Sequence, residues 1–438
     1  MKKLILFTIT VLSLFSCNSK KSTTMSESAF VKQKDGHFVI GDNPYYFIGT
    51  NYWYGAILGS TGEGGNRERL LKELDFMKEN GINNLRVLVG ADGVAGQAVK
   101  VRPTLQTAPG VYNDTIFDGL DFFMAELGKR NMHAVLYLNN SWEWSGGYGQ
   151  YLEWSGKGNV PEKGVYDWPV FVKHVAQYAD CDSCHTMFLN HVKHVVSRTN
   201  KYTGKKYTED TALMSWQVGN EPRVFSDEGK PAFKKWLKET TALIRSLDSN
   251  HLISIGNEGL MGSEGDINLY EEIHADPNVD YLTIHIWPKN WSWIDITKIK
   301  ESVDTAIVRT DKYISEHLAV AKKLDKPITI EEFGFPRDNH KYTLDDPVTA
   351  RDKYYANIFE HIVTASKDKG NIAGCNFWAW GGLGRPAHEF WKPWDDYVGD
   401  PAQEEQGLNS VFDTDSTIKL IKEYADKLNT KLKLKHKE

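Results

Sequence analysis

The fold is indicated most directly by the stretch Ser215-Trp216-Gln217-Val218-Gly219-Asn220-Glu221-Pro222-Arg223. A short run rich in apolar residues stops at the carboxylate of Glu221, and a proline follows immediately. The stretch Ile328-Thr329-Ile330-Glu331-Glu332-Phe333-Gly334 has the same pattern, with a glycine close behind the acid. This pattern is typical of buried parallel strands that end in a loop. The two stretches therefore predict two strands of one sheet, each with an acidic residue at its carboxyl end.

Similar strand patterns recur along the chain and alternate with amphipathic helices. Leu70, Leu74 and Met77, for example, lie on one helical face, and Gly81 marks the end of that helix. Eight strands that alternate with helices predict an α/β fold of the (β/α)8 or TIM-barrel type, with the active site at the carboxyl ends of the strands. A doubly wound open sheet is the alternative, but the chain lacks the glycine-rich first turn of that fold. The predicted strand centres are Phe47, Leu85, Val135, Met214, Ile253, Ile284, Ile330 and Phe377.

We expect one catalytic domain over residues 29–430, although 438 residues would be enough for two or three domains. Barrels with insertions exceed about 400 residues as one unit. Two long connections rich in Trp, Tyr and Gly run from Ser141 to Phe171 after the third strand and from Trp380 to Thr417 after the eighth. On a barrel, both would border the active site. The basic residues of 431–438 predict a frayed, solvated tail.

The first residues predict export and a lipid anchor rather than a part of the fold. Two lysines precede an apolar run from Leu4 to Phe15, which is too short for a stable membrane span. Residues 1–16 resemble a lipoprotein signal peptide that ends at Cys17, and residues 17–28 form a polar linker. An ordinary signal peptide is the alternative. We expect lipidation of Cys17 and, because an asparagine rather than an aspartate follows it, a location at the outer membrane.

The composition argues against some partners and favours others. A net charge of −6 without a basic stripe argues against nucleic acid. His185, His191 and His194 have no carboxylates around them, so we expect a solvated helix face there, and neither a metal nor a cofactor. The 14 tryptophans, many of them in polar stretches, suit sugars, because the apolar face of a sugar ring stacks on indole. We expect a monomer.

Three cysteines follow Cys17. Cys181 and Cys184 have the spacing of a zinc half-site or a redox motif, but neither a second such pair nor a thioredoxin-like pattern accompanies them. In an oxidising compartment, we favour a local disulfide that closes the loop before a helix from Met187 to Arg198. Cys375 lies within an apolar strand, which predicts a small buried side chain.

Polar and aromatic side chains gather at the predicted strand ends. Each of them alone has a structural explanation, such as a surface ion pair for an arginine or a hydrogen-bonded position in the core for a histidine. Their shared position at one end of a barrel favours a binding role instead. We predict that substrate contacts come from Arg86, Asn139, Asn220, Arg223, His285, Trp287 and Trp378, together with Trp53 and Trp142.

Two carboxyl groups that face one pocket suit glycoside hydrolysis, which needs a proton donor and a nucleophile or base. A nucleophile must stay ionised, and Arg86 and His285 would favour the charged form of Glu332. The proton donor needs a less stabilising environment for its charge, which apolar neighbours on the strand would give Glu221.

These motifs resemble those of glycoside hydrolase family 5, a retaining group of clan A barrels, over about residues 30 to 430. The resemblance rests on Asn220-Glu221-Pro222, His285, Glu332-Phe333-Gly334 and Trp378. It implies that Glu221 is the acid/base and Glu332 the nucleophile, with Arg86, Asn220, His285 and Trp378 around the cleaved bond.

Within that family, Asn-Glu-Pro-Arg and the segments from Thr283 to Trp291 and from Phe377 to Gly382 are similar to the endo-β-1,4-mannanase branch. This similarity implies a retaining endo-β-1,4-mannanase that acts on galactomannan or glucomannan. A β-1,4-glucanase of the same family and a glycan-binding lipoprotein without catalysis are the alternatives. Many members carry a tyrosine two residues after the histidine, whereas this chain has Trp287, which donates an N–H but cannot accept a hydrogen bond.

Two neighbours of the paired glutamates need separate assignments. Successive side chains of a strand point in opposite directions, so Glu331 should face away from Glu332 and form an ion pair. The family pattern places the nucleophile directly before Phe-Gly, which selects Glu332. Arg223 follows the acid by two residues and should lie on the leaving-group side of the cleft. A structural salt bridge is its alternative role.

Overall fold

The computed structural model describes residues 30–96, 99–161 and 167–434. The predicted signal peptide, Cys17 and the linker to Ser28 lie outside the described residues. None of the helices in the described ranges has the length and hydropathy of a membrane-spanning segment.

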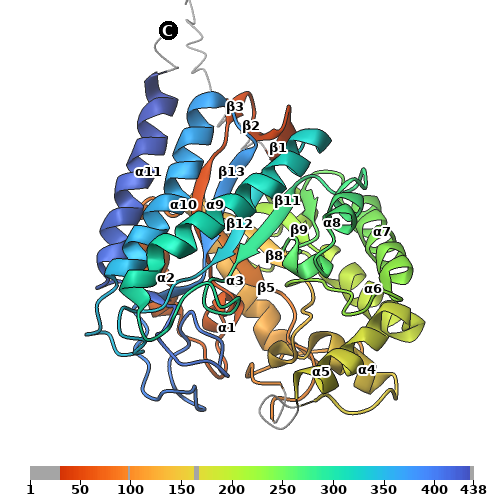
Figure 1. The fold of residues 1–438 in the computed structure, drawn as a ribbon. Helices are drawn as coiled ribbons and strands as arrows, with labels where there is room; N and C mark the ends of the chain where they lie inside the picture. The colour runs from red at the N-terminus through yellow and green to blue at the C-terminus, as the bar shows by residue number, and fades with distance from the viewer. Residues whose placement is uncertain (1–29, 97–98, 162–166, 435–438) are drawn as a thin grey trace, which may run out of the picture.

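Eight parallel strands form a barrel, as the sequence predicts (Figure 1). The strands pair in the order β10-β9-β8-β5-β4-β13-β12-β11, and the pairing of β13 with β4 joins the last strand to the first. At the remaining seam, the backbone N–H of Asp280 donates to the carbonyl of Ile253 at 2.8 Å. All eight predicted strand centres lie in these strands, and the open-sheet alternative is excluded. The strands are β4 (Phe47–Asn51), β5 (Asn84–Leu88), β8 (His133–Tyr137), β9 (Leu213–Gln217), β10 (Leu252–Ser254), β11 (Leu282–Ile286), β12 (Ile328–Phe333) and β13 (Ile372–Phe377).

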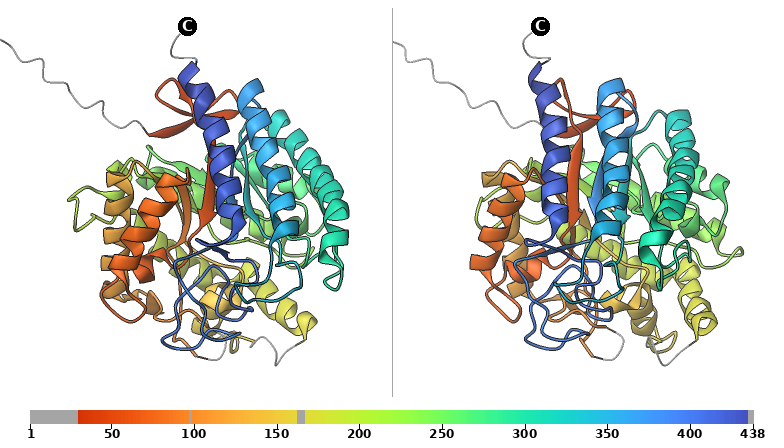
Figure 2. Two further views of the ribbon diagram at one scale, coloured as in Figure 1. Left: turned by 90° about the vertical axis from the view of Figure 1, so that its left-hand side faces the viewer. Right: turned by 60° about the vertical axis from the view of Figure 1, so that its left-hand side comes forward.

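Helices surround the barrel, and Figure 2 shows α9, α10 and α11 side by side on its outer face. The first of the outer helices, α2, begins where Asn66 accepts a hydrogen bond from the N–H of Arg69, and Asn113 caps α3 in the same way. The helices are α2 (Arg67–Glu79), α3 (Asp114–Lys129), α6 (Asp182–Val196), α7 (Lys230–Leu247), α8 (Ile267–His274), α9 (Ile299–Leu324), α10 (Thr349–Asp368) and α11 (Ser416–Leu434).

A small antiparallel sheet closes the end of the barrel where the strands begin. It consists of β1 (Val31–Lys34), β2 (His37–Ile40) and β3 (Asn43–Pro44). Its side chains pack on the amino-terminal ends of the barrel strands, with Phe38 against Phe47 and Tyr281. Because apolar side chains fill this end of the barrel, a ligand can bind only at the opposite end.

The two long connections lie at that opposite end, and they differ in structure. The connection after β8 contains two helices, α4 (Gly147–Trp154) and α5 (Trp168–Val175), which were not predicted. The connection after β13 has little regular structure, apart from α11 at its end and a short pair of strands, β14 (Trp380–Gly382) and β15 (Val411–Phe412). The remaining short elements include α1 (Gly55–Leu58), β6 (Gln106–Ala108) and β7 (Val111–Tyr112).

The helix α11 continues to Leu434 and so includes the first four residues of the predicted basic tail, whereas residues 435–438 lie outside the described residues. One local prediction was wrong. His185 and His191 are buried rather than solvated, since their rings bond to the backbone carbonyls of Tyr178 and Val89. A backbone partner removes the cost of burying a ring nitrogen, and such partners are not visible in the sequence.

The three cysteines of the described residues follow the prediction, but the helix begins at Asp182 rather than at Met187, so Cys184 lies within it. Cys181 and Cys184 form a disulfide at the start of α6, and Cys375 is a free, buried thiol in β13. The disulfide leaves neither Cys181 nor Cys184 free for zinc.

Candidate active site

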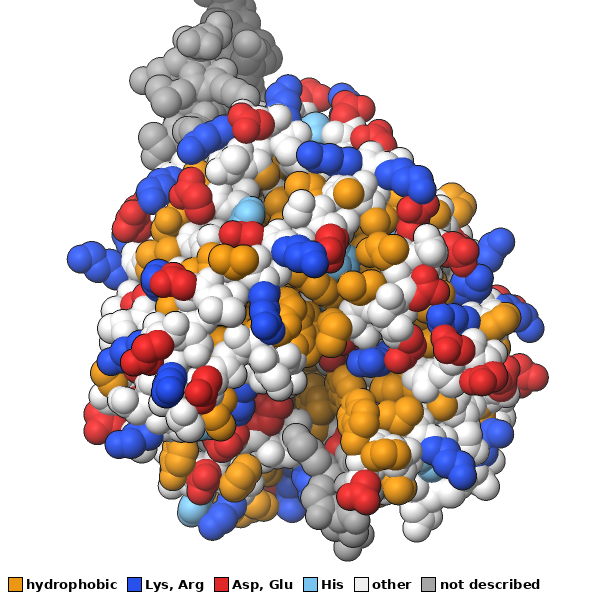
Figure 3. Space-filling model, in the orientation of Figure 1, with side chains coloured by type: hydrophobic (Ala, Val, Ile, Leu, Met, Phe, Trp, Pro, Cys, Tyr) orange, Lys and Arg blue, Asp and Glu red, His pale blue; other side chains and the backbone are white. Residues whose placement is uncertain are grey.

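A cleft of about 820 Å³ opens at the carboxyl ends of the strands. Figure 3 shows hydrophobic side chains gathered around a hollow on the face drawn there. Both predicted catalytic residues, Glu221 and Glu332, line the cleft. Most of the other predicted contacts do so too, namely Asn220, Arg223, Trp287, Trp378 and Trp142.

Glu332 lies at the end of β12 and is held by two donors. The guanidinium of Arg86, which is fully buried, donates from Nη1 to Glu332 Oε1 at 2.5 Å. The indole N–H of Trp287 donates from Nε1 to Glu332 Oε2 at 3.3 Å. Arg86 also binds Asn220 Oδ1 at 2.9 Å, which ties the two halves of the site together.

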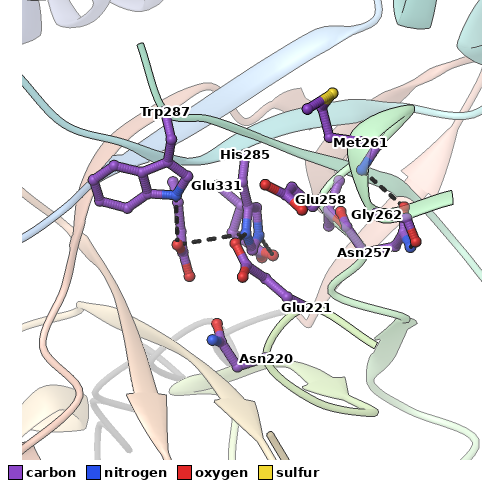
Figure 4. A network of polar contacts seen from close by, with 12 residues as sticks. Asn220, Glu221, Asn257, Glu258, Met261, Gly262, His285, Trp287 and Glu331 are labelled. Carbon is purple, nitrogen blue, oxygen red and sulfur yellow. Dashed lines mark hydrogen bonds and ion pairs between the residues drawn. The ribbon is translucent and has the colours of Figure 1, made fainter. Parts of the chain in front are cut away.

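Glu221 lies four residues after the end of β9, in a conformation that few non-glycine residues adopt, with φ of +52°. Such backbone conformations persist where the surrounding structure enforces them, and they gather at active sites. Here the N–H of Glu221 donates to the carbonyl of Gly256 at 3.0 Å. The carboxylate bonds to His285 Nδ1 at 2.7 Å, and Figure 4 shows the two side chains together. It also accepts from Trp142 Nε1 at 2.5 Å. This turn therefore fixes the direction of the carboxylate.

The two carboxylates lie close together. One oxygen of Glu221, one oxygen of Glu332 and a ring nitrogen of His285 lie within 4.8 Å of one another. Among the described residues, this is the group that could hold a metal ion. Its atoms are already hydrogen-bonded to one another and to Arg86, Trp142 and Trp287, and we assign no metal to it.

The proton distribution in this group differs from the sequence-based expectation. Burial raises the pKa of Glu332 to about 7, and the charge of Glu221 adds to this effect. Burial alone would raise the pKa of Glu221 as well, but hydrogen bonds from His285 and Trp142 lower it below its usual range. Burial alone would lower the pKa of His285, yet the surrounding carboxylates Glu332, Glu221 and Glu331 raise it to about 10. Without substrate, the shared proton therefore favours Glu332.

Glu331 does not face away from the site as predicted. Its Oε2 lies 3.5 Å from Arg86 Nε and 3.7 Å from His285 Nε2, and it accepts a bond from Gln217 at 2.7 Å. The cause is a shift in register, because Ile284 pairs with Ile330 but His285 already pairs with Glu332. One extra residue in β12 forms a bulge that breaks the strict alternation of side chains. The expected ion pair of Glu331 exists, and it is with the same arginine that binds Glu332.

Four predicted contacts are absent from the cleft lining, and two of them, Arg86 and His285, are buried and bind the two carboxylates instead. The other two are Asn139 and Trp53. Asn139 bonds to the hydroxyl of Tyr178 and to the N–H of Asn140. Trp53 is buried, donates to the carbonyl of Gly399 at 2.9 Å and packs against other aromatic rings. Both residues support the walls of the site rather than line it.

Arg223 lines the cleft and also forms the salt bridge that was its alternative role. Its Nε donates to Glu264 at 2.8 Å. Its Nη1 lies 3.7 Å from Glu258, a buried acid in the cleft wall that sequence reasoning missed. Burial and the charge of Glu221 raise the pKa of Glu258 to about 8. The signal was present in the sequence, since Asn257-Glu258 follows a strand just as Asn220-Glu221 does.

The geometry and the sequence identify the family. The profile described as "GH family 5 beta-mannosidase-like" matches residues 28–433. The chain belongs to this family. A glycoside hydrolase family 5 mannosidase from Rhizomucor miehei is 34% identical with a TM-score of 0.85, over 93% of this chain and 99% of that one.

A curated relative agrees with this assignment, and a more distant structure shares the fold. The tomato (Solanum lycopersicum) protein named mannan endo-1,4-beta-mannosidase 4 is 30% identical over 86% of this chain and 89% of its own. An endo-1,4-beta-mannanase from Rhizomucor miehei shares the fold, with a TM-score of 0.63 and 20% identity over 92% of this chain and all of that one. The resemblance to family 5 inferred from the motifs is thereby confirmed.

The first prediction separates the two adjacent glutamates. Glu332→Ala should reduce turnover by about 10⁴-fold or more, because it removes the group held by Arg86 and Trp287. Glu331→Gln keeps an acceptor for Gln217 and should lower turnover by at most about 100-fold through a small displacement of Arg86. Turnover of a glycan by both folded variants, checked by circular dichroism, measures the difference. A larger loss in Glu331→Gln than in Glu332→Ala would contradict the assignment.

The second prediction concerns pH. Glu221 and Glu332 must together hold one proton for acid catalysis. Because the pKa of Glu332 is raised to about 7, the two carboxyl groups keep this proton below that pH and lose it above. We expect kcat/KM to fall about tenfold per pH unit above pH ~7. In Glu221→Ala, assayed with an aryl glycoside whose leaving group needs no proton, this alkaline decline should disappear. An unchanged decline in that variant would place the essential proton on another group.

Proposed function

We propose that this protein is a retaining endo-β-1,4-mannanase that cleaves internal bonds of galactomannan or glucomannan. The observation that carries the proposal is the pair of carboxylates with oxygens within 4.8 Å of one another at the base of an open cleft. Retaining glycosidases hold their carboxyl groups about 5–5.5 Å apart, and inverting ones about 6.5–9.5 Å apart. The names of the relatives support mannan as the substrate.

The reaction proceeds in two steps on the residues of this site. Glu332 attacks the anomeric carbon and forms a glycosyl ester, while the bond to the leaving oxygen breaks and Glu221 gives that oxygen a proton. Glu221 then takes a proton from water, and this water displaces Glu332 and releases the sugar with its original configuration. Arg86 and Trp287 hold Glu332 in line, and His285 lies between the two carboxylates.

Before the first step, the proton must be on Glu221. In the site without substrate it favours Glu332, so substrate binding has to move it within the group. The total charge of the group stays the same, because Glu332 becomes ionised as Glu221 becomes neutral. A sugar oxygen beside Glu221 favours this distribution, since it accepts the hydrogen bond that the neutral carboxyl offers.

The cleft supplies surfaces for the sugars on each side of the cleaved bond. Trp378 and Trp287 meet edge to face at 6.0 Å beside Glu332 and offer an apolar wall to the sugar that is attacked. Arg223 also lines the cleft and feels the charge of Glu221, which supports its assignment to the leaving-group side.

A second candidate is a β-mannosidase that removes sugars from chain ends. The matching profile and the Rhizomucor miehei structure at 34% identity both carry the name mannosidase. Lys289 and Glu405, from the connections after β11 and β13, also approach to 3.8 Å across the cleft lining. A bridge between these two connections would narrow the groove at that point, as action at a chain end requires.

We further propose that Cys17 carries a lipid that holds the enzyme at the outer membrane. The support is the sequence of the first 28 residues alone. Radiolabelled palmitate incorporation in a bacterial host, lost in Cys17→Ala, would establish the anchor.

The third prediction tests substrate and mode together. Purified enzyme is incubated with galactomannan, glucomannan and soluble cellulose, and the products are sized over time, with Glu332→Ala as the inactive control. We expect the mannans to be preferred and oligosaccharides of mixed length to appear first, with a rapid fall in viscosity. Release of mannose alone would favour the second candidate. Preference for cellulose, or binding without any release of sugar, would refute the proposal.

A further inference from the structure

Trp168 is the most exposed aromatic side chain of the cleft lining. It is 54% exposed, whereas most of the other indoles of the described residues are buried or half-buried. It is the first residue of α5, and Pro169 in the first helical turn fixes the backbone there. The ring is thus presented to the cleft by a regular element rather than by an irregular loop.

The position of Trp168 relative to the reacting groups follows from its contacts. Its ring lies 5.9 Å from that of Trp142 and 5.7 Å from that of Phe171, measured between centroids. Trp142 in turn donates to Glu221 Oε2, the carboxylate that protonates the leaving oxygen. Trp142 therefore borders the leaving-group side of the cleft, and Trp168 lies farther out along the same side.

The contacts of Trp168 leave it free for a ligand. Trp142 and Phe171 pack on it, yet more than half of its surface remains in solvent, beside a cleft whose inner wall is aromatic. A large apolar side chain held open next to a binding cleft marks an interaction surface. The apolar face of a sugar ring is the complementary chemistry, because C–H groups pack on the face of an indole.

We propose that Trp168 forms an outer subsite for the leaving-group part of the glycan, at least one sugar beyond the one that contacts Trp142. This inference rests on the proposed function and adds a position that binds substrate without touching the reacting atoms. Binding energy at a remote sugar raises kcat/KM only for substrates long enough to reach it.

The test compares substrates of increasing length. Wild type, Trp168→Ala and Trp168→Phe are assayed with manno-oligosaccharides of two to six sugars and with an aryl β-mannoside. Trp168→Ala should lower kcat/KM about three- to tenfold for the longer oligosaccharides and leave mannobiose and the aryl mannoside unchanged. Trp168→Phe should restore part of the loss, because it retains an aromatic face.

Trp394 provides the matched control, since it is an 82% exposed tryptophan outside the cleft lining. Trp394→Ala should leave the dependence on substrate length unchanged. An equal loss on all substrates, the aryl mannoside included, would overturn the inference and show that Trp168 instead supports Trp142 and Glu221. No loss at any length would overturn it as well. If wild type cleaves none of the mannosides, it is the proposed function that fails, and the inference fails with it.

Discussion

The site depends on one buried cation, the guanidinium of Arg86. Nothing of this side chain is exposed, and it binds Glu332 of β12, Asn51 of β4, Gln217 of β9 and Asn220, which follows β9. A buried charge is tolerated only when it is paired and its hydrogen-bonding groups are satisfied. The barrel offsets the cost of burying this charge, because the carboxylates and amides of several strands meet at one point. That convergence is also what a catalytic pair of carboxylates requires.

The two carboxylates are consequently buried at the ends of barrel strands rather than placed on the long connections. Glu332 is the fifth residue of β12, and Glu221 is held by its strained backbone four residues after the end of β9. The connections after β8 and β13 then add the walls, among them Trp142 and the segment that contains Glu405. Chemistry and specificity are therefore divided between the barrel and its connections. A change in the walls can alter which glycan binds without moving the reacting groups.

The sequence predicts the barrel because each strand is an apolar run with its own stop signal, as at Glu221-Pro222 and Phe333-Gly334. Most of the site follows, since residues at strand ends of a barrel must meet. The bulge at Glu331 was not predictable, because it depends on how β11 and β12 pair and not on either strand alone. The sequence did not predict which of the two carboxyl groups carries the proton, for a related reason. It depends on His285, whose charge arises from three carboxylates that come together only in the fold.

The central claim is that Glu332 attacks the sugar and Glu221 supplies the proton, in two successive displacements. The most direct test follows the anomeric configuration of the first product by proton NMR, during hydrolysis of a manno-oligosaccharide and before mutarotation. The account predicts that the β-anomer appears first and the α-anomer only as mutarotation proceeds. If the α-anomer appeared first, a single displacement by water would have occurred, and the assignment of Glu332 as the nucleophile would be contradicted.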